Sequence, residues 1–133
     1  SQRASEIFAQ ETRDFDLTAR QYAVITTVAH HEGLSQTDLV RLTGIDRSTL
    51  ADVVQRLLKR GVIQRQRTMQ DGRTYAVSLS TEGRELLEAI KPNARRADRL
   101  VLSCLGDEDG KLASRILGRL LRKVDDNPAD GAE

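Results

Sequence analysis

The sequence has a single cysteine, Cys104, and no long hydrophobic run. One cysteine cannot form a disulfide within the chain, which favours a reducing compartment. No run of apolar residues approaches the ~18 that a membrane-spanning helix needs, and no hydrophobic signal-peptide core opens the sequence. These absences favour a cytoplasmic protein with no membrane partner.

Residue patterns typical of enzymes are also missing. The sequence has no glycine-rich phosphate-binding loop, and its only two histidines, His30 and His31, are adjacent. No paired carboxylates accompany them, so we expect the protein not to be an enzyme and to need no cofactor. Adjacent side chains on a helix point about 100° apart, which makes a shared metal site awkward. We therefore predict no metal site and expect the histidines to lie at a helix end, where they favour the dipole.

The net charge is small but unevenly distributed. The 133 residues, enough for one domain, carry 21 basic and 20 acidic side chains, for a formal charge of +1. Residues 1–40 have a charge of −3 and residues 76–133 a charge of −1, whereas residues 41–75 have a charge of +5. Such a basic segment is typical of a surface that binds a polyanion, although a solvated helix face gives the same pattern.

Capping residues mark three helix starts in and before the basic segment. Thr18 with Gln21, and Ser35 with Asp38, have the spacing of capping boxes. Asp46 is placed to cap a third helix. Three glycines are placed to end these helices: Gly33, Gly44 and Gly61. Two short helices joined by a glycine turn predict a helix-turn-helix, with the helix after Asp46 as the presented one.

After the third helix, the apolar period changes from helical to two. Residues 75–79 alternate, and Asp71 with Gly72 is a strong signal for a hairpin turn. Ser80 or its neighbour then begins a long helix, and residues 112–124 form a last, strongly apolar one. The sequence predicts a mainly α fold with a small β-hairpin wing, that is, a winged helix-turn-helix with an added helical region.

The polar face of the presented helix suits DNA. Its first turn is rich in small hydroxyls and arginine, which lets a helix N-terminus enter the major groove. The preceding helix begins with groups that suit phosphates, while Arg73 at the hairpin tip suits a narrow minor groove, with Asp71 supporting its guanidinium. The predicted DNA-binding residues are Ser35, Gln36, Thr37, Arg47, Ser48, Thr49, Gln55, Arg56, Arg73 and Thr74. Each alone is compatible with an ordinary cap or surface residue, so their combination carries the prediction.

These motifs resemble the MarR family of bacterial winged-helix regulators. Residues 33–39, 44–50 and 57–63 read GLSQTDL, GIDRSTL and LLKRGVI. Residues 71–73 and 77–83, DGR and VSLSTEG, are similar to that family's wing and the start of its long helix. The close resemblance covers residues 18 to 91, and it departs at Gly72, where many relatives carry a polar or basic residue.

The resemblance implies a homodimeric transcriptional regulator, expected to be a repressor of a pseudo-palindromic operator with half-sites about 34–36 Å apart. It implies a helical dimerisation region at residues 1–17 and 85–133 and a DNA-binding lobe at residues 18–84, in one folding unit. It also implies release by a small effector, aromatic or phenolic, with an acyl thioester as another possibility. The positions that match its effector site are Phe8, Arg13, Phe15, Tyr22 and Arg95, although the three aromatic residues also suit a plain core.

Three alternatives remain at this point. Some relatives sense oxidants through cysteine, but Cys104 is flanked by leucine and serine at a helix end, so we expect it to be buried and inert. Some relatives sense zinc, for which His30 and His31 with Glu32 are candidates. A winged helix used only for contact with another protein is the third, and it would not require the basic segment.

Overall fold

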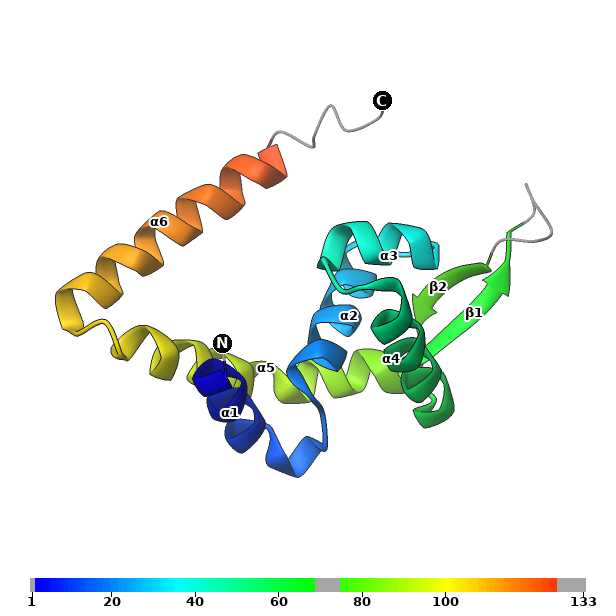
Figure 1. The fold of residues 1–133 in the computed structure, drawn as a ribbon, viewed down its shortest axis with the longest axis horizontal. Coiled ribbons are helices and arrows are strands. Elements are labelled where there is room, and N and C mark those ends of the chain that lie inside the picture. Colours follow the sequence, from blue (N-terminus) through cyan, green and yellow to red (C-terminus); the bar gives the residue numbers. More distant parts are fainter. Residues whose placement is uncertain (1, 69–74, 127–133) are drawn as a thin grey trace.

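The computed structural model describes residues 2–68 and 75–126, with side chains described up to residue 123. Its elements, in chain order, are α1 (Gln2–Glu11), the short 3-10 helix η1 (Arg13–Phe15), α2 (Ala19–His30), α3 (Gln36–Thr43), α4 (Arg47–Arg60), β1 (Ile63–Arg67), β2 (Tyr75–Leu79), α5 (Thr81–Ser103) and α6 (Asp107–Asp126). The predicted mainly α fold with a two-stranded hairpin is confirmed (Figure 1).

The predicted helix starts are also confirmed. The hydroxyl of Thr18 accepts from the amide of Gln21 at 3.1 Å, and the Gln21 side chain accepts from the amide of Thr18 at 3.0 Å. Asp46 caps α4 in the same way, accepting from the amide of Thr49 at 2.9 Å. These bonds satisfy amides that have no partner inside the helix, which fixes where each helix begins.

One predicted helix end was wrong. Helix α2 ends at His30 rather than at Gly33. Gly33 has φ +86°, a left-handed conformation that suits glycine, and its amide donates to the carbonyl of Val77 at 3.1 Å. The next residue, Leu34, forms an isolated bridge with Val77. This glycine therefore brings the chain alongside β2 and thereby places the start of α3 next to the hairpin.

A single apolar core joins α2, α3, α4, the hairpin and the first half of α5. Its fully buried large side chains come from each of these elements: Val24, Ile25, Val28, Leu39, Leu50, Val54, Leu57, Val77, Leu79 and Ile90. Burying one such side chain contributes about 1.5–3 kcal/mol, so this cluster holds the lobe together. The cluster ends at Ile90. The second half of α5 and all of α6 therefore lie outside it.

The hairpin is attached to α5 by a close backbone approach. Strands β1 and β2 pair antiparallel, with Ile63 opposite Leu79. A Cβ atom built on Gly83 would lie 1.9 Å from the carbonyl oxygen of Val62, so only glycine fits at this position in the first turn of α5. Ser80, which caps α5, also donates its hydroxyl to the carbonyl of Gly61 at 2.6 Å. The wing and the long helix are thus fixed to each other.

Gly83→Ala is expected to destabilise the protein by about 1–3 kcal/mol, because the added methyl must push α5 away from the backbone of Val62. Thr81→Ala, at an exposed position two residues earlier, is the control and should have a much smaller effect. Urea unfolding followed by circular dichroism measures both. Equal stability of the two variants would contradict the close packing of Gly83 on Val62.

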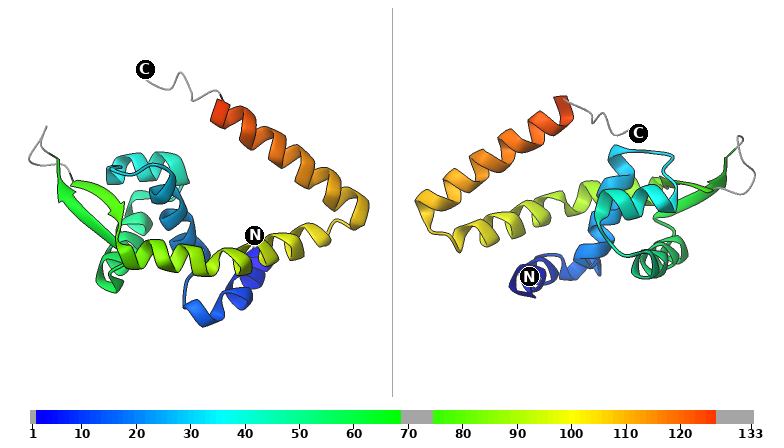
Figure 2. Two further views of the ribbon diagram at one scale, coloured as in Figure 1. Left: turned by 180° about the vertical axis from the view of Figure 1, so that it is seen from behind. Right: turned by 45° about the horizontal axis from the view of Figure 1, so that its top comes forward.

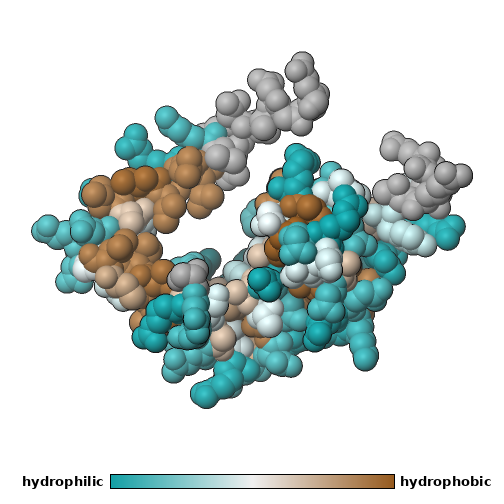
Figure 3. All heavy atoms as spheres, viewed as in Figure 1, coloured by the Kyte–Doolittle hydropathy of each residue, from teal (hydrophilic) through white to brown (hydrophobic). Residues whose placement is uncertain are grey.

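Helices α5 and α6 extend away from the lobe. In Figures 1 and 2, α5 runs from the hairpin past α1, and α6 folds back from its far end as the second arm of an open V. Large apolar side chains are exposed along α6 and the end of α5, on the side that faces the hollow (Figure 3): Leu100, Val101, Leu105, Leu112, Ile116, Leu117, Leu120 and Leu121. Such a contiguous patch is typical of an interaction surface.

Cys104 does not have the predicted environment. It lies at the turn between α5 and α6 and is exposed, with its thiol 3.5 Å from the carbonyl of Leu100. The prediction of burial was wrong because the leucines beside it, such as Leu105, belong to the exposed apolar side and not to the core. None of the described helices is long and apolar enough to cross a membrane.

Candidate nucleic-acid interface

The N-terminus of α4 is open to solvent, as a presented helix requires. Arg47 and Ser48 begin the helix directly after its Asp46 cap, and both side chains are exposed. The core face of α4 is held by Leu50 and Val54, which are buried. Because the core fixes the rotation of the helix, the first turn is held outward. The arrangement matches what a helix needs to contact base edges in a major groove.

The other predicted residues of α4 do not all share this face. Gln55 is exposed and lines a groove that reaches β1. Thr49 is half-buried and lines a different groove, between α4 and the turn that joins α1 to α2. Arg56 lines both, and its Nε donates to Asp52 at 2.9 Å. The predicted set is therefore divided between two sides of the helix.

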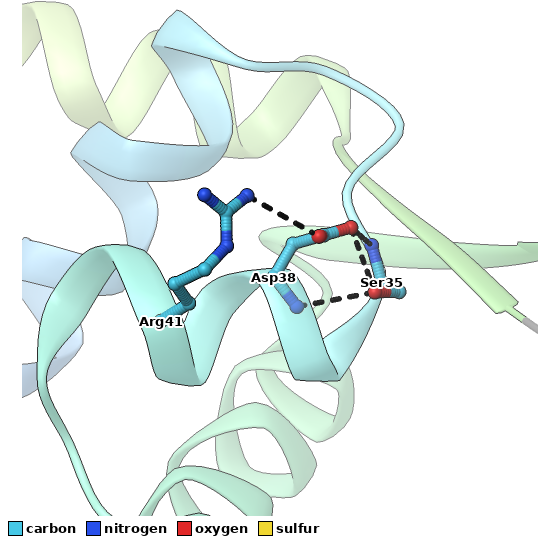
Figure 4. Close-up of polar contacts among 3 residues, drawn as sticks. All are labelled: Ser35, Asp38 and Arg41. Carbon is cyan, nitrogen blue, oxygen red and sulfur yellow. Dashed lines mark hydrogen bonds and ion pairs between the residues drawn. The ribbon is translucent and has the colours of Figure 1, made fainter. Parts of the chain in front are cut away.

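The N-terminus of α3 is built around Ser35 (Figure 4). Its hydroxyl accepts from the amide of Asp38 at 3.1 Å and donates to the Asp38 carboxylate at 2.7 Å. Arg41 forms an ion pair with the same carboxylate, at 3.5 Å. The Ser35 hydroxyl is thus engaged inside the capping box. The polar side chains beside it are Gln36, half-buried, and Thr37, exposed, which leaves Thr37 the more accessible to a phosphate.

The pKa of Asp38 lies below its ordinary value near 3.8, first because of the hydrogen bond from the Ser35 hydroxyl and then because of the Ser35 amide. The Arg41 guanidinium lowers this pKa further. A carboxyl whose pKa is lower in the folded state stabilises the fold above its ordinary pKa, and loses that effect as pH falls through the folded-state pKa.

Ser35→Ala is expected to cost about 1 kcal/mol of stability at pH 7, the usual loss for a helix cap. The pKa of Asp38 should rise in this variant, and the stability deficit should shrink as pH falls below 4. Urea unfolding at pH 7 and pH 3, with an NMR titration of the aspartates, measures both effects. Ser48→Ala, which removes an exposed hydroxyl, is the matched control. An unchanged pKa of Asp38 would contradict the proposed role of the hydroxyl.

The hairpin tip lies outside the described residues. Three predicted residues, Asp71, Arg73 and Thr74, fall there, as does the departure at Gly72.

The described part of the hairpin shows basic residues that were not among the predicted site residues. The guanidiniums of two β1 arginines lie over the ring of Tyr75. The sequence spacing indicated this arrangement, because alternate residues of a strand lie on one face and the two arginines are two positions apart.

Three of the five predicted effector residues lie together. Phe8 and Tyr22 have ring centroids 5.2 Å apart, and both line a pocket of about 780 Å³ with Arg95 and Asp98. The pocket is bounded by α1, α2, α5 and α6. Its volume is in the range of small-molecule sites, about 300–1,000 Å³. It therefore combines aromatic surface with two cationic groups, Arg95 and Arg99, and one acidic group, Asp98.

The electrostatics of this pocket follow from partial burial. Burial raises the pKa of Tyr22, and the nearby Asp98 raises it further. Burial also raises the pKa of the Asp98 carboxyl. Desolvation of this kind strengthens hydrogen bonds to a bound polar molecule, because water competes less for each group. Partly desolvated groups in a concave site are typical of ligand binding.

The other two predicted effector residues lie elsewhere. Arg13 is exposed and lines the groove between α4 and the α1–α2 turn. Phe15, half-buried, packs against the core of the lobe. The carbonyls of Phe15 and Asp16 accept hydrogen bonds from Arg60 at the end of α4, with 2.5 Å between Arg60 Nη1 and the Asp16 oxygen. This turn therefore links α1, beside the pocket, to α4.

The histidines lie where a helix-end position predicts. His30 is the last residue of α2, and its Nδ1 lies 2.8 Å from the carbonyl of Thr26. His31 follows as the C-cap, and both are exposed. Within residues 2–68 and 75–123, no three histidine, cysteine or carboxylate side chains are grouped to hold a metal ion.

Comparisons with known proteins agree with this geometry. The sequence profile of the MarR family matches residues 15–74. The chain is 31% identical over 126 residues to the HTH-type transcriptional repressor NicR of Pseudomonas putida, spanning 95% of this chain and 79% of NicR. A probable transcriptional regulator from Pseudomonas aeruginosa superposes with a TM-score of 0.79 at 38% identity, spanning 90% of this chain and 89% of the other.

A further similar structure is that of BpsR from Bordetella bronchiseptica, described for the regulation of its DNA binding by 6-hydroxynicotinic acid. Its TM-score is 0.73 at 31% identity, and the match spans 93% of this chain and 91% of BpsR. The overall fold is thus shared with these regulators. The chain belongs to the MarR family of transcriptional regulators.

Proposed function

We propose that the protein is a homodimeric repressor that binds a pseudo-palindromic operator in the bacterial cytoplasm and is released by a small aromatic effector. The observation that carries the DNA-binding part is the open first turn of α4, where Arg47 and Ser48 are exposed directly after the Asp46 cap. A helix fixed by its core face and presenting arginine at its start suits base recognition in a major groove.

The exposed apolar side of α6 supports the dimer. It is too large and too continuous for an isolated helix, and a second copy would cover it by a self-complementary, two-fold contact. The dimerisation region would comprise residues 1–17 and 85–133, and the DNA-binding lobe residues 18–84. The core of the lobe also takes in Leu87 and Ile90 from α5. The two regions thus share α5, which makes them one folding unit.

The pocket at Phe8, Tyr22 and Arg95 is the proposed effector site. Its two rings suit an aromatic ring, Arg95 suits a carboxylate, and Asp98 suits a hydroxyl or ring N–H donor of the ligand. A hydroxylated aromatic acid satisfies all three. The pocket lies between α1 and α5, and the Arg60 bonds to the α1–α2 turn give its occupancy a route to the position of α4.

The effector proposal predicts that hydroxylated aromatic acids raise the melting temperature and release the protein from DNA. Arg95→Ala should weaken acid binding about 10- to 100-fold, because it removes a charged hydrogen bond worth about 1.5–3 kcal/mol. Arg96→Ala is the matched control, since Arg96 is exposed and pairs with Glu11 instead. Thermal shift and fluorescence anisotropy with a panel of acids and acyl thioesters measure both effects. Equal loss in the two variants, or a response to thioesters alone, would contradict the assigned site.

A further inference from the structure

The outer part of the hairpin carries an arginine–tyrosine cluster, formed by Arg65, Arg67 and Tyr75. The register places Arg65 opposite Val77 and Arg67 opposite Tyr75. These four residues therefore lie on the same face of the hairpin as Ile63, the first residue of β1. Ile63 and Val77 are buried in the core. Nearer the tip the same face leaves the core, and it becomes basic and aromatic.

The ring of Tyr75 holds both guanidiniums. Arg65 Cζ lies 5.1 Å and Arg67 Cζ 5.6 Å from the ring centroid, within the range of cation–π contacts. Arg67 Nε also donates to the Tyr75 hydroxyl at 3.2 Å. All three side chains are exposed. Two charged groups are therefore held close together in contact with solvent, which lowers the entropy that binding would otherwise cost.

One member of the cluster, Arg65, lines a groove that separates the hairpin from the presented helix. Gln55, Arg56, Leu58 and Lys59 of α4 line this groove of about 610 Å³ together with Arg65 of β1. Arg56 and Lys59 add two cations on the opposite wall. The groove thus lies between the helix assigned to the major groove and the hairpin whose tip is assigned to the minor groove. Between those two grooves of DNA runs one sugar–phosphate strand.

We propose that Arg65 and Arg67, positioned by Tyr75, clamp the phosphates of the strand that separates the two grooves. The proposal rests on the proposed DNA-binding function. A planar guanidinium binds phosphate oxygens through two hydrogen bonds, and two arginines stacked on one ring suit successive phosphates. Such contacts fix the register of the protein on the duplex and carry no sequence information.

The test is the salt dependence of binding by the full chain, with the double variant Arg65→Gln/Arg67→Gln. Each lost phosphate contact should reduce the slope of log K against log salt by about 0.9. Loss of one contact per subunit already lowers the slope of a dimer by about 1.8 and the affinity by about 10- to 100-fold at 0.1 M salt. Arg115→Gln, at an exposed position of α6 far from the hairpin, is the matched control.

The preference for operator over unrelated duplex should be unchanged in the double variant. An unchanged slope, or a changed sequence preference, would overturn the clamp. Tyr75→Leu keeps both charges but removes the ring, so it should lower affinity several-fold at an unaltered slope, whereas Tyr75→Phe should bind within about twofold of wild type. Equal binding by Tyr75→Leu and wild type would overturn the positioning role of the ring.

This design separates the two proposals. If the wild-type chain binds no duplex more tightly than another, the proposed regulator function fails, whatever the variants do. If the wild type selects an operator, and the double variant keeps the slope of wild type, only the clamp fails. Circular dichroism of each variant checks that the exposed substitutions leave the fold intact.

Discussion

Leu120→Glu is expected to hold the protein as a monomer and to weaken operator binding at least about 100-fold. Leu120 is 55% exposed in the centre of the apolar side of α6, so its side chain is available to a second copy. A glutamate there would have to be desolvated without a partner when the dimer forms. A monomer then binds one half-site at a time and loses the roughly 10²- to 10⁴-fold gain of two linked lobes.

The control for this variant is Arg115→Glu, which introduces the same residue on the polar side of α6. It should remain dimeric. Light scattering during size-exclusion chromatography gives the mass of each variant, and anisotropy gives the affinity for DNA. Circular dichroism shows whether the monomer keeps its helices. A dimeric Leu120→Glu protein with unaltered DNA affinity would contradict the assignment of this surface.

Arg47→Ala should change which sequences the protein prefers as well as how tightly it binds. Arg47 is the first residue of α4 and is exposed directly beyond the Asp46 cap. A guanidinium at this position can reach two acceptors on one guanine, a contact worth about 1–3 kcal/mol of discrimination. That corresponds to about 5- to 150-fold in each half-site, and the dimer carries two copies.

The measurement compares the affinity of Arg47→Ala for the operator and for duplexes with single base changes in each half-site. Relaxed discrimination at one position of both half-sites supports base contact by Arg47. A uniform loss on all duplexes would make Arg47 a phosphate contact instead. Arg115→Ala, with its side chain exposed on α6, serves as the matched control and should bind as wild type does.

Local sequence signals predicted the helices of the lobe well, because the starts of these helices are set by hydrogen bonds between residues three positions apart. Thr18, Ser35 and Asp46 each accept an amide three residues further on, so their spacing alone defines a helix start. The apolar stripe of α4 likewise follows from helical period. The hairpin follows from its alternation and from the Asp71-Gly72 turn signal.

Features that depend on distant parts of the chain were missed. Glycine is a residue type common at helix ends, which led to the prediction for Gly33. Its amide instead donates a hydrogen bond to the carbonyl of Val77, 44 residues away, and that contact sets its conformation. Cys104 lies among leucines that suit a core, yet these leucines face outward. Arg13 and Phe15 are only a few residues from the pocket in sequence, but the η1 turn directs them toward α4 and the core.

The Arg65–Tyr75 contact shows the same limit at the site. Its arginines were visible as charge, but their pairing with a particular ring depends on strand register, which sequence alone leaves open. The placement of residues within one helix turn was thus predictable, whereas contacts built across elements required the fold. The effector pocket is of the second kind, since it draws on α1, α2, α5 and α6.

The most direct test of the central claim is selection of bound duplexes from a random library by the wild-type chain, followed by sequencing. A homodimeric winged-helix regulator should enrich a pseudo-palindrome whose half-site centres lie about 10 base pairs, or a multiple of one helical turn, apart. No enriched sequence, or an enriched single site without two-fold symmetry, would contradict a dimer that reads DNA with α4.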